Sequence, residues 1–532
     1  MENDLPTPSA AAAFTNEDDD EIDVDETPLF LDQSEVEEVQ VEEDDMPMSD
    51  DDDDNEEGGT TSAPTVISAT DTGATKVAAA EEDMSKVKLE THTGQVYAVA
   101  CSYNSTNQTL SIVSGGGDDR AYVHKVQASS SSSSATTSPS PQVESKLLEY
   151  LHKDSVSCVA FNTPYVSSDL TKTPHYCAVG AYDGTIVLYD PLTGQKCQEL
   201  EGPSDVEWVE FHPKGGSVLL AGSVADGTIW MYHLPTSKCL QVFVGHESGV
   251  TAGTFTPDGR WALSASSDGT LRIWAPRTGM NKHVFRFTAG GNSGSGSGGY
   301  HNNDDEPVPG LTSIGVGGGS DGQLIITGAE DGMAYVCHYG TKKVVASLRH
   351  FEPPLSDTSN ARMSEDDQEM ELPMSVEAVG FASTHVNPNW CATGGVDGIL
   401  KIWDLNNDGQ CRQVCRVPSV QEEEQEGQDT TASSSSSSVG GITRLQWHPT
   451  LPLVLTSMSD GTVRLWDARN GALVQTVTGH EDMINDLAVE FVTPEQQGGG
   501  TAVIVTGSDD KTVRLFEIDI ATALEGGTTS SS

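Results

Sequence analysis

Hydrophobic and polar residues alternate over short runs along most of this chain, with the two-residue period of β-strands. Residues 270–274, TLRIW, follow Asp268-Gly269, a dipeptide suited to a two-residue hairpin because both central positions need positive φ. Four strands are expected in this unit, at residues 249–255, 261–265, 270–274 and 282–288. Between Lys86 and Asp519, no long segment without Pro has its apolar residues at the spacing of one helix face. The pattern therefore predicts an all-β fold.

The unit built around Asp268 occurs eight times, each time with an aspartate six residues before an aromatic residue or its substitute. The aspartates are Asp118, Asp183, Asp226, Asp268, Asp331, Asp397, Asp460 and Asp510. The residues six positions later are His124, Tyr189, Tyr232, Trp274, Cys337, Trp403, Trp466 and Phe516. Two intervals between neighbouring aspartates are 42 and 43 residues, and the others are 50 to 66. A repeat of about 40 to 45 residues is typical of a four-stranded propeller blade, so the sequence predicts eight blades, several with insertions.

Low-complexity segments account for most of the longer intervals. They are polyserine at 129–134, a Gly/Ser segment at 290–299, an acidic segment at 364–371 and a Glu- and Ser-rich segment at 422–438. Such segments contain too little apolar surface to offset the entropy of ordering, so we expect loops.

The two ends of the repeat region predict how the ring closes. After residues 515–518 the sequence is too poor in apolar residues for a fourth strand, whereas residues 86–90 form a short alternating strand before the first repeat. We expect this strand to complete the eighth blade, which removes an open sheet edge. The expected organisation is a disordered acidic tail at 1–83, an eight-bladed propeller at 84–520 and a disordered tail at 521–532.

The chain is strongly acidic, with a formal net charge of −53 over 532 residues. Residues 1–83 hold 29 of the 81 acidic residues and a single base, Lys76. This charge repels nucleic acid and anionic membranes and attracts basic protein segments, so neither direct nucleic-acid binding nor membrane insertion is expected. The tail either keeps the protein soluble or captures basic ligands, and the sequence favours neither.

Motifs for catalysis or metal binding are absent from the sequence. It contains no nucleophile elbow, phosphate-binding loop or HExxH motif, and its histidines include repeat elements at His92, His152, His246 and His480. The nine cysteines lack a strong zinc signature and are expected to be reduced. With no signal peptide and no long apolar run, the sequence predicts a monomeric, non-catalytic binding protein of the cytosol or nucleus, without cofactor or metal.

The repeated unit resembles that of the WD-repeat propellers, in which a His, a Ser or Thr, the Asp and a Trp are hydrogen-bonded inside each blade. The fourth copy matches best, with His246, Ser264, Asp268 and Trp274. The resemblance assigns corresponding roles to Thr393, Asp397, Trp403, Thr456, Asp460 and Trp466, with no His in register in the seventh copy. It implies that these aspartates stabilise blades, because a satisfied buried network rigidifies a sheet.

Loop placement predicts a candidate binding face. In a blade with strands a to d, the d-to-a and b-to-c connections lie at one face, and the insertions at 290–306, 350–373 and 418–438 all fall in d-to-a connections. Beyond these acidic insertions, the acids expected at the same face are Asp119, Asp154, Asp205, Glu207, Glu247, Glu330, Asp482 and Asp509. They are either solvated loop residues or a receptor for a Lys/Arg-rich peptide.

Three segments narrow the resemblance to one family. GGGDDRAYVHKV at 115–126, HKDSVSCVAF at 152–161 and DVEWVEFHPKGGSVLLAGSVADGTIWMYHL at 205–234 resemble the angio-associated migratory cell protein family, which includes a yeast chaperone dedicated to one large-subunit ribosomal protein. The resemblance implies a chaperone that holds the basic N-terminal segment of a newly made ribosomal protein until it joins the 60S particle. A signalling or cell-migration adaptor and a binder of other basic cargo, such as histones, remain alternatives, since fold alone does not fix function. The Ser-, Gly- and Glu-rich insertions and Cys337 depart from the family pattern.

Overall fold

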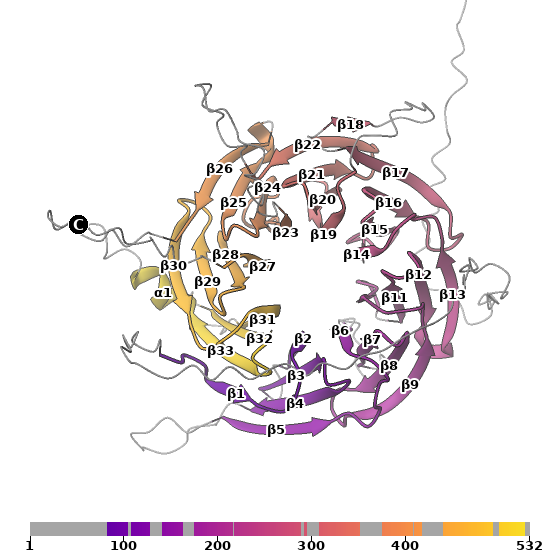
Figure 1. The fold of residues 1–532 in the computed structure, drawn as a ribbon. Helices are drawn as coiled ribbons and strands as arrows, with labels where there is room; N and C mark the ends of the chain where they lie inside the picture. The colour runs from indigo at the N-terminus through magenta and orange to yellow at the C-terminus, as the bar shows by residue number, and fades with distance from the viewer. Residues whose placement is uncertain are drawn as a thin grey trace, which may run out of the picture. The chain divides into compact units, whose positions relative to one another are not determined.

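The structure is a computed structural model. It describes residues 82–104, 108–127, 141–162, 175–215, 217–288, 292–294, 308–351, 375–407, 409–417, 440–492 and 500–526, with only the backbone at 292–294 and 525–526. Residues 1–81, which hold nearly all of the predicted acidic tail, and residues 527–532 lie outside the described residues, as do most of the predicted loop insertions. Eight antiparallel sheets are arranged in a ring (Figure 1), which confirms the predicted eight-bladed β-propeller.

The first four blades follow the chain in order. Blade one contains β2 (Val96–Asn104), β3 (Thr109–Gly116), β4 (Ala121–Gln127) and β5 (Gln142–Leu147). Blade two contains β6 (Val156–Phe161), β7 (Cys177–Ala181), β8 (Thr185–Asp190) and β9 (Gln195–Glu201). Blade three contains β10 (Trp208–Phe211), β11 (Val218–Gly222), β12 (Ile229–His233) and β13 (Lys238–Phe243), with a short 3₁₀ turn, η2 (Leu234–Thr236). Blade four contains β14 (Val250–Phe255), β15 (Ala262–Ser266), β16 (Thr270–Trp274), β17 (Asn281–Thr288) and a fifth strand, β18 (Asn292–Gly294).

The remaining blades repeat this arrangement. Blade five contains β19 (Leu311–Gly318), β20 (Leu324–Ala329), β21 (Met333–His338) and β22 (Lys343–Arg349). Blade six contains β23 (Val376–Phe381), β24 (Trp390–Gly395), β25 (Leu400–Asp404), η3 (Leu405–Asn407) and β26 (Gln410–Cys415). Blade seven contains β27 (Ile442–Trp447), β28 (Leu453–Met458), β29 (Val463–Asp467) and β30 (Ala472–Val477). Blade eight contains β31 (Ile484–Val492), β32 (Thr501–Ser508), β33 (Val513–Asp519) and β1 (Val87–Leu89).

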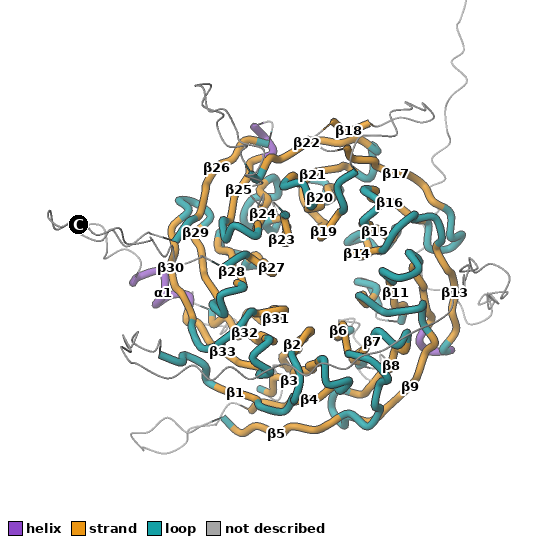
Figure 2. The backbone as a smooth tube through the Cα atoms, viewed as in Figure 1, coloured by secondary structure: helices purple, strands orange, loops and turns teal. Residues whose placement is uncertain are grey.

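The first strand of each blade is innermost and the fourth is outermost, and loops join the strands at the two faces of the ring (Figure 2). The hydrophobic core lies between neighbouring blades. Ile112 and Val113 on β3 are both fully buried, but Ile112 packs with the eighth blade and Val113 packs with the second. Because successive residues of a strand point to opposite faces, each sheet buries both of its faces against neighbours. A single blade cannot do this alone, so the ring is the stable unit.

The N-terminal strand closes the ring at its outer edge, as the sequence predicted. β1 pairs antiparallel with β33, with Val87 opposite Leu515 and Leu89 opposite Val513. The contact extends before β1, because the carboxylate of Asp83 lies 2.5 Å from the guanidinium of Arg514. The sequence analysis assigned Asp83 to the acidic tail, whereas this contact places it against blade eight.

Two further segments differ from the sequence-based expectation. Residues 292–294, inside the predicted Gly/Ser loop, form β18, which pairs antiparallel with β17. At the C-terminus, the predicted disordered tail begins instead with a helix, α1 (Ile520–Gly526). Ile520 is almost fully buried, and Asp519 Oδ1 accepts a hydrogen bond from Ala521 N at 3.0 Å. Apolar contact with blades seven and eight and this capping carboxylate account for the extra turn.

Candidate binding face

His246, Ser264, Asp268 and Trp274 form one hydrogen-bonded group inside blade four. His246 Nδ1 lies 2.9 Å from Asp268 Oδ2, and His246 Nε2 lies 2.7 Å from Ser264 Oγ. Trp274 Nε1 donates to the same serine oxygen at 2.8 Å. Burial alone would raise the pKa of Asp268, but hydrogen bonds from His246 and Thr270 outweigh burial and hold that pKa below its usual value. This carboxylate therefore serves the blade and is not left for a ligand.

Blade six contains a corresponding group that includes a histidine missed by the sequence analysis. Trp403 Nε1 donates to Thr393 Oγ1 at 2.8 Å, and His350 Nδ1 lies 2.7 Å from the same oxygen. His350 Nε2 lies 3.5 Å from Asp397 Oδ1. A long insertion separates His350 from the first strand of blade six. The spacing between the histidine and its partners in the chain is therefore longer than in blade four. Its position directly after the fourth strand of blade five, β22, was the feature of the sequence that could have identified it.

Blade seven joins only two of its three predicted partners. Trp466 Nε1 donates to Thr456 Oγ1 at 3.0 Å. Asp460 instead accepts a hydrogen bond from Thr462 N at 3.0 Å and pairs with Arg464 Nη2 at 2.5 Å. An arginine thus neutralises the aspartate in the blade where the sequence has no histidine in register.

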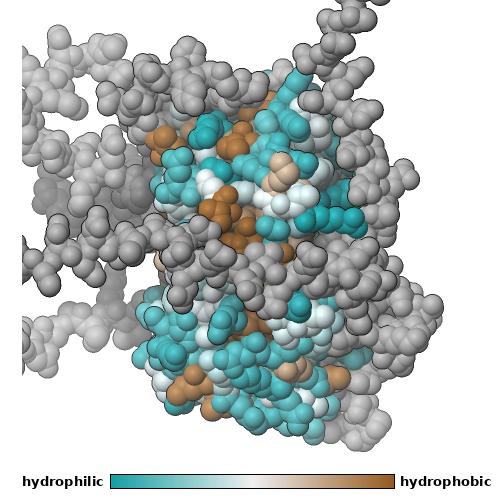
Figure 3. All heavy atoms as spheres, turned by 90° about the vertical axis from the view of Figure 1, so that its right-hand side faces the viewer, coloured by the Kyte–Doolittle hydropathy of each residue, from teal (hydrophilic) through white to brown (hydrophobic). Residues whose placement is uncertain are grey.

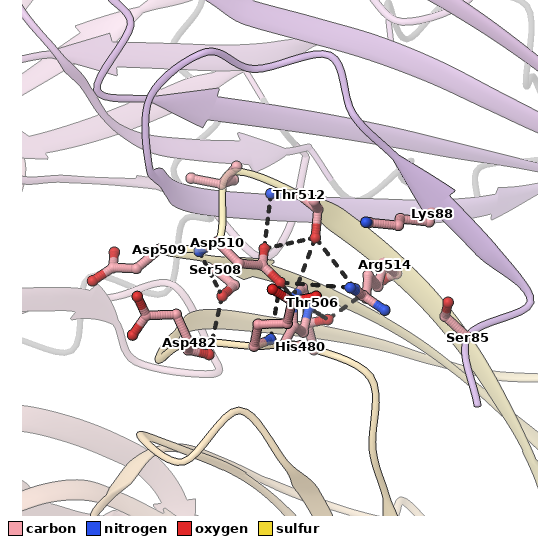
Figure 4. A network of polar contacts seen from close by, with 12 residues as sticks. Ser85, Lys88, His480, Asp482, Thr506, Ser508, Asp509, Asp510, Thr512 and Arg514 are labelled. Atoms are coloured by element: carbon pink, nitrogen blue, oxygen red, sulfur yellow. Dashed lines mark hydrogen bonds and ion pairs between the residues drawn. The ribbon is translucent and has the colours of Figure 1, made fainter. Parts of the chain in front are cut away.

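Blade eight shows the difference between buried and outward carboxylates. His480 Nδ1 lies 2.8 Å from Asp510 Oδ2, and His480 Nε2 lies 2.7 Å from Thr506 Oγ1. In Figure 4, Asp482 and Asp509 lie beside this group with their carboxylates pointing away from His480. The repeat therefore places one aspartate inside the blade and leaves neighbouring acids for the surface.

The two faces of the ring differ in charge. In the described parts of the d-to-a and b-to-c connections, nineteen residues are acidic and four are basic, a formal balance of −15. The described a-to-b and c-to-d connections contain two acids and five bases. Four aspartates that end third strands, Asp190, Asp404, Asp467 and Asp519, lie at this second face and bring it close to neutral. We call the first surface the acidic face.

All eight acids predicted for binding lie in the connections of the acidic face. Asp154, Glu247, Glu330 and Asp482 are exposed, and Asp119, Asp205, Glu207 and Asp509 are half-buried. Two of the half-buried acids also hold loops in place. Asp205 Oδ1 accepts hydrogen bonds from Ser223 Oγ and from Ala225 N, and Asp509 Oδ1 accepts one from Asn485 Nδ2 at 2.7 Å. The exposed acids are the better positioned to meet a partner.

Glu207 occupies a repeat position that connects neighbouring blades in four other places of the ring. The equivalent side chains of Ser157, Thr251, Thr312 and Asn485 each donate to a backbone carbonyl at the start of the next blade. An ionised carboxylate cannot donate, so Glu207 cannot form this bond.

Glu207 bonds to the acidic face instead of to the next blade. Burial raises its pKa, and the negative charge of Asp205 adds to this, while a hydrogen bond with Tyr182 partly opposes it. A cationic side chain beside Glu207 would stabilise its ionised form and lower its pKa again.

The innermost strands carry further acids that the sequence analysis did not single out. They are Glu210, Glu377, Asp486 and Glu490, and the described first strands contain one base, Arg444. Asp486 Oδ1 accepts a hydrogen bond from Arg444 Nε at 3.2 Å, and burial raises the pKa of Glu210 to about 7. In the sequence these acids lie within strands and not in connections. Their position facing the centre of the ring becomes clear only when the first strand of each blade is seen to be innermost.

The outer side of the ring over β13 and β17 is mainly hydrophilic, with hydrophobic residues in separate small groups (Figure 3).

No group of three or more His, Cys, Asp or Glu side chains in the described residues could hold a metal ion. None of the helices described is long and apolar enough to cross a membrane.

The fold and its repeats define a WD-repeat β-propeller. The family model described as WD domain, G-beta repeat matches residues 84–125, 237–275, 375–404, 431–467 and 471–517. The angio-associated migratory cell protein of Homo sapiens is 31% identical over 434 residues, which cover 82% of this chain and 80% of the human protein. The chain belongs to the angio-associated migratory cell protein family.

Solved structures of similar fold include two Sqt1 proteins. Sqt1 of Saccharomyces cerevisiae has a TM-score of 0.58 at 15% identity, covering 82% of this chain and 100% of that structure. Sqt1 of Chaetomium thermophilum, solved bound to the N-terminus of the ribosomal protein L10, has a TM-score of 0.56 at 18% identity with the same coverage. At this identity the likeness establishes the fold alone.

Proposed function

We propose that this protein is a dedicated chaperone that captures the basic N-terminal segment of a newly made large-subunit ribosomal protein, of the L10 kind, and holds it until 60S assembly. The observation that carries the proposal is the excess of acids in the described connections of one face, where eleven acids besides the eight repeat aspartates stand against four bases, while the described part of the opposite face is near neutral. The Chaetomium thermophilum structure with the N-terminus of L10 supports a ligand of this class for a propeller of this fold.

The acidic face suits a cationic polypeptide better than other ligands. Complementary charge speeds the encounter and excludes wrong partners. The described connections of this face contain nineteen acids and four bases, so the face repels phosphate backbones. Proteins bind nucleic acids mainly by neutralising phosphates with Lys and Arg. A ribosomal protein segment that binds RNA after assembly must be basic, so before assembly it needs an acidic partner in place of RNA.

The cysteines support action in the cytosol or nucleus. All nine are free thiols in the structure, and burial raises the pKa of Cys177, Cys337 and Cys391 well above the usual value. Such thiols are unreactive and need no oxidising compartment. We also propose that the propeller acts as a monomer, since a second copy would bring another acidic face.

Capture of the cargo can be tested with charge-reversed variants. Tagged wild-type protein, Asp154→Lys/Glu247→Lys and the control Glu144→Lys/Glu199→Lys would be used to recover partners from cells at low and moderate salt. The control reverses two exposed acids on the outermost strands β5 and β9, outside the acidic face. The wild type and the control are expected to enrich one unassembled large-subunit ribosomal protein, and the double reversal at Asp154 and Glu247 is expected to lose it. Enrichment of signalling proteins instead would favour an adaptor, and enrichment unaffected by the reversal would overturn the role of the acidic face.

A further inference from the structure

Exposed hydrophobic residues are concentrated on one sector of the acidic face. Among the described connections of this face, the exposed large hydrophobic residues are Leu151, Tyr182, Val224, Val244 and Val308. All five lie between the connection that enters blade two and the connection that enters blade five. The described connections elsewhere on this face have none, so the sector combines apolar surface with charge in a way that the rest does not.

Within this sector, Tyr182 and Val224 flank two carboxylates. Tyr182 is 39% exposed and its hydroxyl is hydrogen-bonded to Glu207. Val224 is 40% exposed and lies between Ser223 and Ala225, the two residues that donate to Asp205. Apolar and acidic side chains are therefore neighbours across blades two and three. We call Tyr182 and Val224, together with Val244 in the connection that enters blade four, the apolar patch.

We propose that the apolar patch binds large apolar side chains of an extended basic segment, whose Lys and Arg residues contact the adjacent acids. This inference rests on the proposed function and adds a requirement for the cargo. Charge alone is not sufficient, and the captured segment must interleave basic residues with large apolar ones. Successive side chains of an extended chain point to opposite sides, so a segment in which pairs of basic residues alternate with pairs of apolar ones presents both kinds to a surface where apolar and acidic groups are neighbours.

Charge decides between the occupants that an apolar patch could accept. A second copy of this chain would bring its own acidic face, and an anionic membrane surface would be repelled by the same carboxylates. A basic segment is attracted by Asp154, Asp205 and Glu247, and it covers exposed apolar surface when it binds. Salt screens the attraction between charges and leaves the burial of apolar surface largely unchanged, so the two contributions to affinity can be separated by experiment.

Two synthetic peptides of equal charge provide the test. Both are twelve-residue peptides with six Arg in three pairs, separated by Leu-Tyr pairs in one peptide and by Ser-Ser pairs in the other. Fluorescence anisotropy would measure their affinities for the wild type, for Val224→Ser/Val244→Ser, and for the control Leu192→Ser/Met280→Ser. The control removes two exposed apolar residues from c-to-d turns at the opposite face. The patch variant leaves the Tyr182–Glu207 hydrogen bond intact, and melting temperatures would verify that each variant is folded.

The wild type and the control are expected to prefer the Arg/Leu/Tyr peptide by about tenfold at moderate salt, a difference that the patch variant loses. Equal affinity for the two peptides, or a preference unchanged in the patch variant, would overturn the apolar patch while leaving the acidic face as a receptor. Failure of both peptides to bind the wild type would overturn the patch and the proposed function together.

Discussion

Asn485 Nδ2 donates a hydrogen bond at 3.0 Å to the carbonyl oxygen of Val96 and so joins the last blade to the first along the innermost strands. Next to it, Asp486 Oδ2 accepts a hydrogen bond from Val99 N at 2.9 Å. At the outer edge, β1 closes the same blade by pairing with β33. The ring is therefore fastened at its inner edge by residues 387 and 389 positions apart in the chain, and at its outer edge by residues 431 positions apart.

The inner fastening is expected to contribute measurably to stability. Asn485→Ala removes the donor and leaves the Val96 carbonyl without this partner, which should lower the free energy of unfolding by about 1 to 3 kcal/mol. Urea unfolding followed by intrinsic fluorescence measures the change. Asn281→Ala, at an exposed position of β17, is the control and should unfold like the wild type. Identical unfolding of the two variants would show that the bond to Val96 does not fasten the ring.

Truncation tests the outer fastening. A chain beginning at residue 82 keeps the Asp83–Arg514 ion pair and β1, whereas a chain beginning at residue 90 lacks both. The shorter chain exposes the edge of β33 and is expected to melt at a much lower temperature or to aggregate. The longer chain should melt like the full-length protein. Equal melting of the two truncated chains would contradict closure by β1.

The buried aspartates are expected to be structural. Asp268→Asn weakens the acceptor for His246, Thr270 and the Glu247 backbone, and should lower stability by about 1 to 3 kcal/mol. Glu247→Gln removes a charge from the adjacent exposed position and is the control. Thermal melting would measure both. If Asp268→Asn melts like the wild type, the hydrogen-bonded group does not stabilise blade four.

Buried histidines give the fold a defined pH dependence. Burial lowers the pKa of His124 to about 3, whereas an unfolded histidine titrates near about 6.5. Below pH 6.5 the unfolded chain binds a proton that the folded chain does not, so the stability contributed by neutral His124 is lost as pH falls. His124→Gln cannot bind this proton. The stability deficit of His124→Gln relative to the wild type should therefore shrink between pH 7 and pH 5.

The comparison with His124→Gln cancels carboxylate protonation, which affects both proteins alike. Urea unfolding of the pair at pH 7, 6 and 5 gives the difference directly. A difference that is independent of pH would mean that His124 is not held neutral in the folded protein.

Most residues that act within one repeat could be predicted from the sequence, whereas side-chain hydrogen bonds between repeats could not. The alternation around Asp268 and its recurrence specify strands, turns and blade number, because these depend on local spacing. The role of Asn485 depends on where Val96 lies after the ring has closed. His350 was missed because an insertion changes its spacing, and Glu207 was predicted as an acid of the binding face without its hydrogen bond to Tyr182.

The candidate face shows the same division. Topology placed Asp154, Glu247 and Asp482 at one face, since the order of strands in a blade fixes which connections share a side. The apolar patch could not be predicted, because Val224 and Tyr182 resemble ordinary turn residues until their exposure is known. The fold was therefore more predictable than the pattern of its surface.

The most direct test is the affinity of purified protein for a synthetic N-terminal peptide of its own organism's L10-type ribosomal protein, measured by calorimetry from low to moderate salt. The account predicts binding that weakens with salt, is lost in Asp154→Lys/Glu247→Lys and is kept in Glu144→Lys/Glu199→Lys. Affinity that is independent of salt and equal in the wild type and both variants would contradict it.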